Sequence, residues 1–168
     1  MKKILLLIAL TTMISCMKEN VPGARQAKNK ARIAEFYREL VNKHNADLVD
    51  SFFSDSVIDH ELGTNPVKKD SVKNGFLQFF ATYKDVKVDP KFLIAEGDTV
   101  FAWVSLKCTT NLSGTPMADK NVNINGAIIF VLRDDRITER WRFFDDREAL
   151  IQMGVSSIAP IDSSGIKK

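Results

Sequence analysis

The sequence predicts an α+β fold, with helices in the first half of the domain and antiparallel strands in the second. Apolar residues recur at helical spacing between residues 30 and 83, the period becomes two after residue 86, and short turn signals separate the later strands. The chain has 168 residues, 45% of them hydrophobic and 27% charged, which is typical of one globular domain.

Residues 1–15 are predicted to be a signal peptide. Two lysines precede the apolar run 4–10, which is shorter than the roughly 20 residues that a membrane span needs. The stretch "MISC" resembles the bacterial lipoprotein box, whose cysteine receives lipid; an ordinary secretory peptide is the alternative. We therefore expect a membrane-anchored lipoprotein of the bacterial cell envelope, periplasmic or cell-surface, lipidated at Cys16, with residues 16–29 as a tether.

The net charge is too close to zero for a nucleic-acid-binding protein. It is +3 for the whole chain and falls to +1 without the leader, since 3 − 2 removes Lys2 and Lys3. Binding to nucleic acid would require a concentrated basic surface, so no nucleic-acid partner is expected.

Three helices are expected first. The first spans residues 30–45 and carries an apolar stripe made of Ile33, Phe36, Tyr37, Leu40 and Val41. A short helix follows near residues 47–53, then the strand "SVIDHEL", which ends at Gly63. The third helix covers residues 64–83 and begins near Pro66.

Alternating strands make up most of the second half. They are predicted at residues 86–98, 99–110, 121–132 and 136–144. A last helix starts at Asp145 and stops at Gly154, and residues 155–168 form a polar tail. The long strand 99–110 is bulky on both faces, so one face should cover the helices and a pocket while the other meets a second subunit in a homodimer.

Several of these stretches together resemble a known family. "AEGDTVFAW", "SGTP" and "NINGAIIFVLRDDRITERWRFFDDREALIQMG" are similar to the SnoaL-like polyketide cyclases, within the nuclear transport factor 2-like superfamily that includes ketosteroid isomerase. The resemblance covers residues 30–154. It implies a cone: a curved antiparallel sheet wrapped round N-terminal helices, with an apolar pocket at its wide end.

The resemblance also implies candidate catalytic residues. Enzymes of this group remove a proton next to a carbonyl, which needs a base and hydrogen-bond donors for the oxyanion. Carried over by position, the base falls at or beside His60 and the helix tyrosine at Tyr37. The alternatives are that His60 only caps a strand end and that Tyr37 only packs in the core.

Two family acid–base positions are replaced in this chain. The resemblance aligns them with Ile128 and Arg142, and an arginine cannot serve as a base. Arg142 and Arg140 should instead face the pocket, where they would suit an anionic ligand group. The alternative is that Arg142 pairs internally with Asp59 or Glu61. Ile128, Trp103 and Asp59 complete the predicted ligand-binding set.

Other residues have structural explanations. Asp145 is followed by Glu148 three positions later, which favours helix capping over chemistry. Cys108 alternates with apolar residues and is expected to be buried. Two histidines without paired spacing predict no metal site, and we expect no cofactor. The sequence thus leaves two hypotheses: an isomerase- or cyclase-type enzyme, or a non-catalytic module. Either would bind a small apolar molecule, with or without an anionic group.

Overall fold

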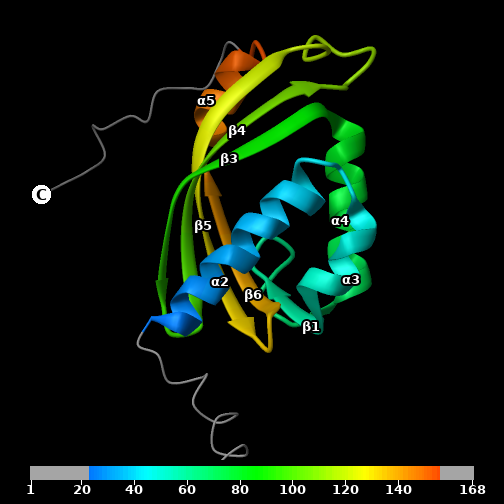
Figure 1. The fold of residues 1–168 in the computed structure, drawn as a ribbon. Coiled ribbons are helices and arrows are strands. Elements are labelled where there is room, and N and C mark those ends of the chain that lie inside the picture. The colour runs from blue at the N-terminus through cyan, green and yellow to red at the C-terminus, as the bar shows by residue number, and fades with distance from the viewer. Residues whose placement is uncertain (1–22, 156–168) are drawn as a thin grey trace, which may run out of the picture.

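The fold is a curved sheet wrapped round helices, as the computed structural model of residues 23–155 shows (Figure 1). The predicted signal peptide, Cys16 and most of the predicted tail lie outside the described residues. The helical elements are α2 (Ala24–Glu35), the π-helical turn η1 (Phe36–Val41), η2 (Ala46–Leu48), α3 (Val49–Phe52), α4 (Lys69–Thr82) and α5 (Asp146–Gln152). The strands are β1 (Phe53–Asp59), β2 (Val67–Lys68), β3 (Tyr83–Glu96), β4 (Thr99–Thr110), β5 (Asn121–Arg133) and β6 (Arg136–Phe144).

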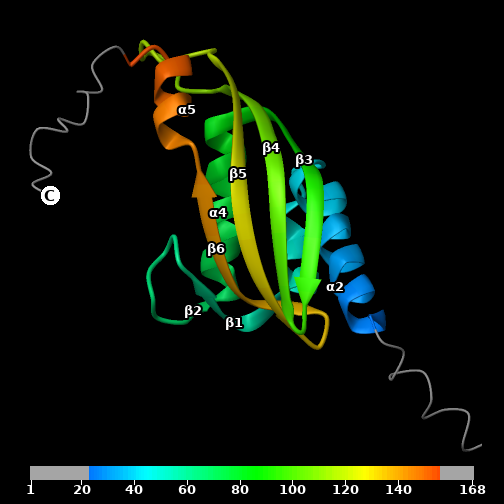
Figure 2. The same ribbon diagram turned by 90° about the vertical axis from the view of Figure 1, so that its left-hand side faces the viewer.

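One six-stranded sheet runs in the order β2-β1-β6-β5-β4-β3. Its strands are antiparallel except for the parallel pair of β1 and β6. Helices α2 and α4 lie against one face, and the opposite face of the long strands is left uncovered (Figures 1 and 2). The predicted α+β cone is therefore confirmed. The pairing of β1 with β6 joins strands that are far apart in the sequence, so local periodicity could not predict it.

The first helix begins at Ala24, so residues 24–29 of the predicted tether are helical. They lack an apolar stripe, and contacts with the sheet explain the extension. Arg25 pairs with Asp98, and the Asn29 side-chain amide donates to the Gly97 carbonyl over 3.1 Å. This start of α2 is thereby fixed at the turn between β3 and β4.

Strand β1 is displaced relative to its prediction. It begins at Phe53 and ends at Asp59, so His60 lies in the turn that follows. That turn is held by the amide of Leu62, which donates to the Asp59 carbonyl over 2.8 Å, and by the amide of His60, which donates to the Arg140 carbonyl over 3.1 Å. Residues 64–68, predicted as the start of a helix, instead contain the short strand β2.

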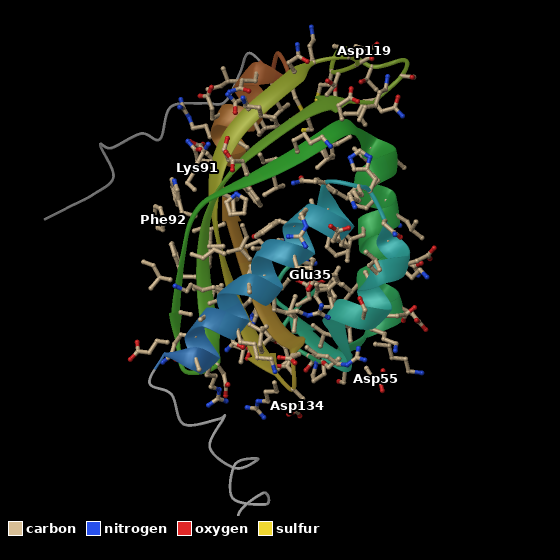
Figure 3. All side chains as sticks on the ribbon, viewed as in Figure 1. Glu35, Asp55, Lys91, Phe92, Asp119 and Asp134 are labelled. Carbon is tan, nitrogen blue, oxygen red and sulfur yellow. The ribbon has the colours of Figure 1, made fainter. Side chains whose placement is uncertain are left out.

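Strands β5 and β6 form the hairpin that the stretch "RDD" predicts. Asp134 and Asp135 have φ values of 49° and 62°, the two left-handed conformations of a type I′ turn. Aspartate tolerates this region better than most residues, and the turn matches the twist of its strands. The turn lies at the same end of the molecule as the start of α2, where Lys28 pairs with Asp135 (Figure 3).

A bulge at Thr138 changes which side chains face inward. Glu139 lies opposite Val131 and Ile137 opposite Leu132, so Thr138 has no partner residue in the ladder. The predicted alternation would put Ile137 on the same face as Trp141, yet Ile137 is fully buried. The extra residue lets Ile137 and Arg140 both point into the molecule, which strict alternation would forbid.

Candidate ligand-binding cavity

A cavity of about 270 Å³ lies inside the cone, between the concave face of the sheet and the helical elements η1, α4 and α5. Most of its lining is hydrocarbon or aromatic, with a few charged groups, as ligand pockets generally have. The residues that line it are Phe36, Tyr37, Val41, Glu61, Phe76, Phe79, Tyr83, Val88, Leu106, Cys108, Val122, Ile124, Ile128, Phe130, Arg140, Arg142, Phe144, Asp146, Ala149 and Met153.

Tyr37 reaches this cavity from η1. Its ring packs edge-on against Phe36 and Phe130, at centroid distances of 5.1 and 6.1 Å, and the residue is 4% exposed. Its hydroxyl is buried and has no hydrogen-bond partner. Burial raises the pKa of this hydroxyl, against the opposing effect of Arg140 and Arg142. Tyr37 is therefore protonated at neutral pH and can donate a hydrogen bond, but it cannot serve as a base.

Arg140 and Asp59 form a buried ion pair beside the cavity. The Arg140 Nε donates to Asp59 Oδ2 over 2.9 Å, and both side chains are almost inaccessible to solvent. The guanidinium also lies over the rings of Phe53 and Phe76, at 5.4 and 5.2 Å from their centroids. The register of the parallel pair places these residues opposite each other, so β1 and β6 build the contact.

Arg142 lies two residues further along β6 and pairs with Glu61 through its Nη2. Its Nε is buried and has no partner. Burial lowers the pKa of the guanidinium, and the carboxylate of Asp59 acts in the opposite direction. Both arginines thus line the cavity and both carry an internal carboxylate partner, which combines the two alternatives that the sequence left open.

The remaining predicted residues divide between the inside and the outside of the cone. Ile128 is buried and lines the cavity from β5. Trp103 is partly buried and is not among the lining residues, because β4 turns Ala102 and Val104 inward on either side of it. Because side chains alternate between the two faces along β4, the Trp103 indole faces away from the cavity.

His60 lies outside the cavity. Its ring stacks on Trp141 at a centroid distance of 4.3 Å, and its Nε2 lies 2.9 Å from Glu139 Oε1. Asp59 faces inward to Arg140, so the next side chain points to the other side of the sheet. The structure therefore brings Tyr37, Arg140, Arg142 and Ile128 to one cavity with Asp59 beside it, and leaves His60 apart.

Sequence reasoning missed most of the apolar lining and one acid, Asp146. Leu106, Val122 and Ile124 come from the inward positions of β4 and β5, a face that alternation alone identifies as buried but not as a pocket wall. Glu61 was expected only as a possible partner of Arg142, and Asp146 had no signal for facing the cavity, because it begins α5 in a helix-start pattern that capping alone explains.

Gly126 makes room for one wall of the cavity. It lies opposite Phe144 in the ladder, and a Cβ at this glycine would come within 2.3 Å of the Phe144 ring. The phenyl ring therefore lies directly over the glycine backbone and can turn towards the cavity that it lines. A side chain at position 126 would displace this wall.

Cys108 is a buried thiol in the lining. It is unpaired, and burial raises its pKa to about 11. The thiolate is the reactive form, so this side chain is inert near neutral pH and acts as a small apolar residue, as the sequence predicts.

Asp145 caps the last helix. Its Oδ1 accepts a hydrogen bond from the Glu148 amide over 3.0 Å, which confirms the predicted cap. The reciprocal half of a capping box is missing, because the Glu148 carboxylate accepts instead from Gln152 over 2.8 Å.

Replacing Asp145 with alanine is expected to lower the free energy of unfolding by about 0.5–2 kcal/mol, because one helix amide loses its partner. The melting temperature should fall by several degrees. The affinity of the cavity for an apolar probe should not change, and a lost affinity at unchanged stability would contradict the capping role. Thermal unfolding and probe titration of the same sample provide the two values.

Within residues 23–155, no cluster of three metal-ligating side chains occurs. No helix in that range is long and apolar enough to cross a membrane.

Comparison with known proteins shows which family has this architecture. A family model described as SnoaL-like polyketide cyclase matches residues 31–153. The structure is similar to a proposed polyketide cyclase from Acidithiobacillus ferrooxidans, with a TM-score of 0.69 and 20% identity, covering 77% of this chain and 96% of that one. No curated protein matches the chain in sequence.

Two Streptomyces proteins show the same similarity. IdmH, a proposed polyketide cyclase from Streptomyces antibioticus, gives a TM-score of 0.66 and 19% identity over 75% of this chain and 98% of its own. AclR, a proposed hydroxylase from Streptomyces galilaeus, gives a TM-score of 0.66 and 17% identity, covering 80% of this chain and 86% of its own. At these identities the similarity shows the fold alone, and function must come from the site.

Proposed function

The chain belongs to the SnoaL-like polyketide cyclase family, and on that basis we propose that its cavity binds a small, mainly apolar molecule. The observation that carries this proposal is the cavity itself. Close-packed interiors leave few voids larger than a water molecule, whereas this one measures about 270 Å³ and has a mostly apolar lining. A ligand that replaced water there would bury apolar surface against most of the lining.

The distribution of acids and bases supports binding over proton transfer. Family-type chemistry needs a base beside the ligand. Among the described lining residues, the carboxylates are Glu61, which pairs with Arg142, and Asp146, which begins α5. His60 lies outside and Tyr37 keeps its proton. An isomerase or cyclase activity remains the second candidate, supported by two free donors that could stabilise an oxyanion, Tyr37 Oη and Arg142 Nε.

Binding of 2-ethylnaphthalene, a rigid hydrocarbon probe, tests the proposal. Saturating probe should raise the melting temperature, because a ligand that binds only the folded state stabilises it in proportion to the logarithm of its concentration over Kd. Calorimetric titration should show one site per chain. No shift and no heat at the solubility limit of the probe would reject the cavity as a binding site.

We also propose that the uncovered face of the sheet joins two copies of the chain. Phe92, Ile94 and Phe143 are 49%, 60% and 58% exposed there, and Phe92 projects from β3 away from the helices (Figure 3). Such side chains on one face favour a protein interface. Sedimentation velocity should show a dimer that Ile94→Asp dissociates, whereas Leu77→Asp, at another exposed apolar site on α4, should leave it intact.

Anchoring through Cys16 is a further proposal that rests on the sequence. Arg25 and Lys28 attach the start of α2 to the turns β3–β4 and β5–β6, at the end of the sheet away from α5 (Figure 1). A lipid anchor would therefore enter the domain at the end opposite to α5. Metabolic labelling with a fatty acid should mark the wild-type protein and not Cys16→Ser, and equal labelling would contradict the anchor.

A further inference from the structure

Two buried polar groups in the cavity lack a partner. In the part of the chain that the structure describes, the buried side-chain polar atoms without any hydrogen bond are Tyr37 Oη and Arg142 Nε. Both residues line the same cavity, one from η1 and the other from β6. Because more than nine in ten buried polar groups in proteins are satisfied, this pair indicates that a ligand supplies the missing partner.

The chemistry of the two groups defines what that partner must be. An arginine N–H can only donate, and the Tyr37 hydroxyl is protonated and free to donate as well. The ligand atom that satisfies them must therefore accept hydrogen bonds. A hydrocarbon would leave both donors unsatisfied, and a ligand N–H donor could not bond to Arg142.

The charges around the cavity favour an uncharged acceptor. Arg140 is paired with Asp59 and Arg142 with Glu61, so each guanidinium already has a carboxylate. Asp146 also lines the cavity, so with Asp59 beside it three carboxylates surround the site, against two arginines. An incoming carboxylate would meet this excess of negative charge or would have to displace Glu61, whereas a carbonyl oxygen would not.

Building on the proposed binding function, we propose that the ligand is an uncharged apolar molecule with a carbonyl-type oxygen, which accepts hydrogen bonds from the Tyr37 hydroxyl and from Arg142 Nε. The apolar body of the ligand occupies the space between Leu106, Ile124 and Ile128. The two donors fix its orientation, as a few placed polar groups do in mainly apolar pockets.

Three naphthalenes of nearly equal size test this proposal at neutral pH: 2-acetylnaphthalene, 2-ethylnaphthalene and 2-naphthoate. They carry a neutral acceptor, no acceptor and a carboxylate. Titration calorimetry on the full folded chain should give a Kd for the ketone at least about tenfold lower than for either of the others, because only the ketone satisfies the donors without adding charge.

Variants locate the effect. Tyr37→Phe and Arg142→Met should each reduce the preference for the ketone over 2-ethylnaphthalene severalfold, as the ratio of the two Kd values measured on the same variant shows. Arg147→Met, the same substitution at an exposed position of α5 outside the cavity lining, should change neither affinity. In the free protein, Tyr37→Phe should not lower the melting temperature, since its hydroxyl has no partner to lose.

The possible outcomes separate this inference from the proposed function. Equal binding of all three probes would overturn the acceptor site and leave the apolar cavity as a binding site. Tightest binding of 2-naphthoate would overturn the uncharged ligand. Binding of none of the three would reject the proposed function, and the acceptor site with it. A ketone preference that survives both substitutions would place the acceptor site elsewhere.

Discussion

Replacing Asp59 with alanine is expected to lower the free energy of unfolding by about 3–5 kcal/mol. The substitution leaves the Arg140 guanidinium buried between Phe53 and Phe76 without a counter-charge. The carboxylate that is removed accepts from Arg140 Nε over 2.9 Å, and it is 1% exposed, so water cannot replace it without opening the cone. Urea unfolding followed by circular dichroism measures the loss.

Two controls isolate the cause of that loss. The double variant Asp59→Leu with Arg140→Met removes both charges and should recover most of the stability, because an apolar pair of similar size can replace a buried ion pair. Asp55→Ala removes an exposed aspartate from the same strand, and it should leave the melting temperature almost unchanged. A double variant as unstable as Asp59→Ala would show that packing, and not the unpaired charge, explains the effect.

Filling the cavity with a larger side chain should abolish ligand binding. Ile124→Trp places an indole where the apolar body of the ligand would lie, since Ile124 lines the cavity from β5. We expect the affinity for 2-ethylnaphthalene to fall at least about tenfold, while the protein keeps its fold because an existing void accepts much of the added volume. Calorimetric titration measures the affinity, and circular dichroism checks the fold.

Ile129→Trp is the matched control. It makes the same substitution further along β5, at an odd separation from Ile124, so its side chain points to the opposite face of the sheet. Its affinity for the probe should equal that of the wild type. If Ile129→Trp abolished binding and Ile124→Trp did not, the ligand site would lie on the uncovered face and not inside the cone.

Local patterns in the sequence predict most of the fold. The strands of the second half are found within a few residues of their predicted bounds, because alternation and the turn at Asp134 and Asp135 are both local signals. The start of α2 is not predictable in this way, since residues 24–29 are held by Gly97 and Asp98 from a distant turn. The pairing of β1 with β6 and the bulge at Thr138 likewise depend on contacts far apart in the chain.

The candidate site was less predictable than the fold. Resemblance to a family brought Tyr37, Ile128 and Arg142 to one place, and the structure puts all three in the lining. It could not determine the side of the sheet that His60 faces, because that depends on the neighbouring Asp59 pointing inward to Arg140 of β6, a contact between distant parts of the chain. It could not decide either whether Arg142 pairs with Asp59 or with Glu61, because both acids lie in the same predicted strand.

The most direct test is a nuclear Overhauser measurement on methyl-labelled protein saturated with 2-ethylnaphthalene. Binding inside the cone predicts contacts between the probe and the methyl groups of Leu106, Val122, Ile124 and Ile128, which line the cavity. Contacts restricted to Ile94 and Ile129, on the uncovered face of the sheet, would contradict it.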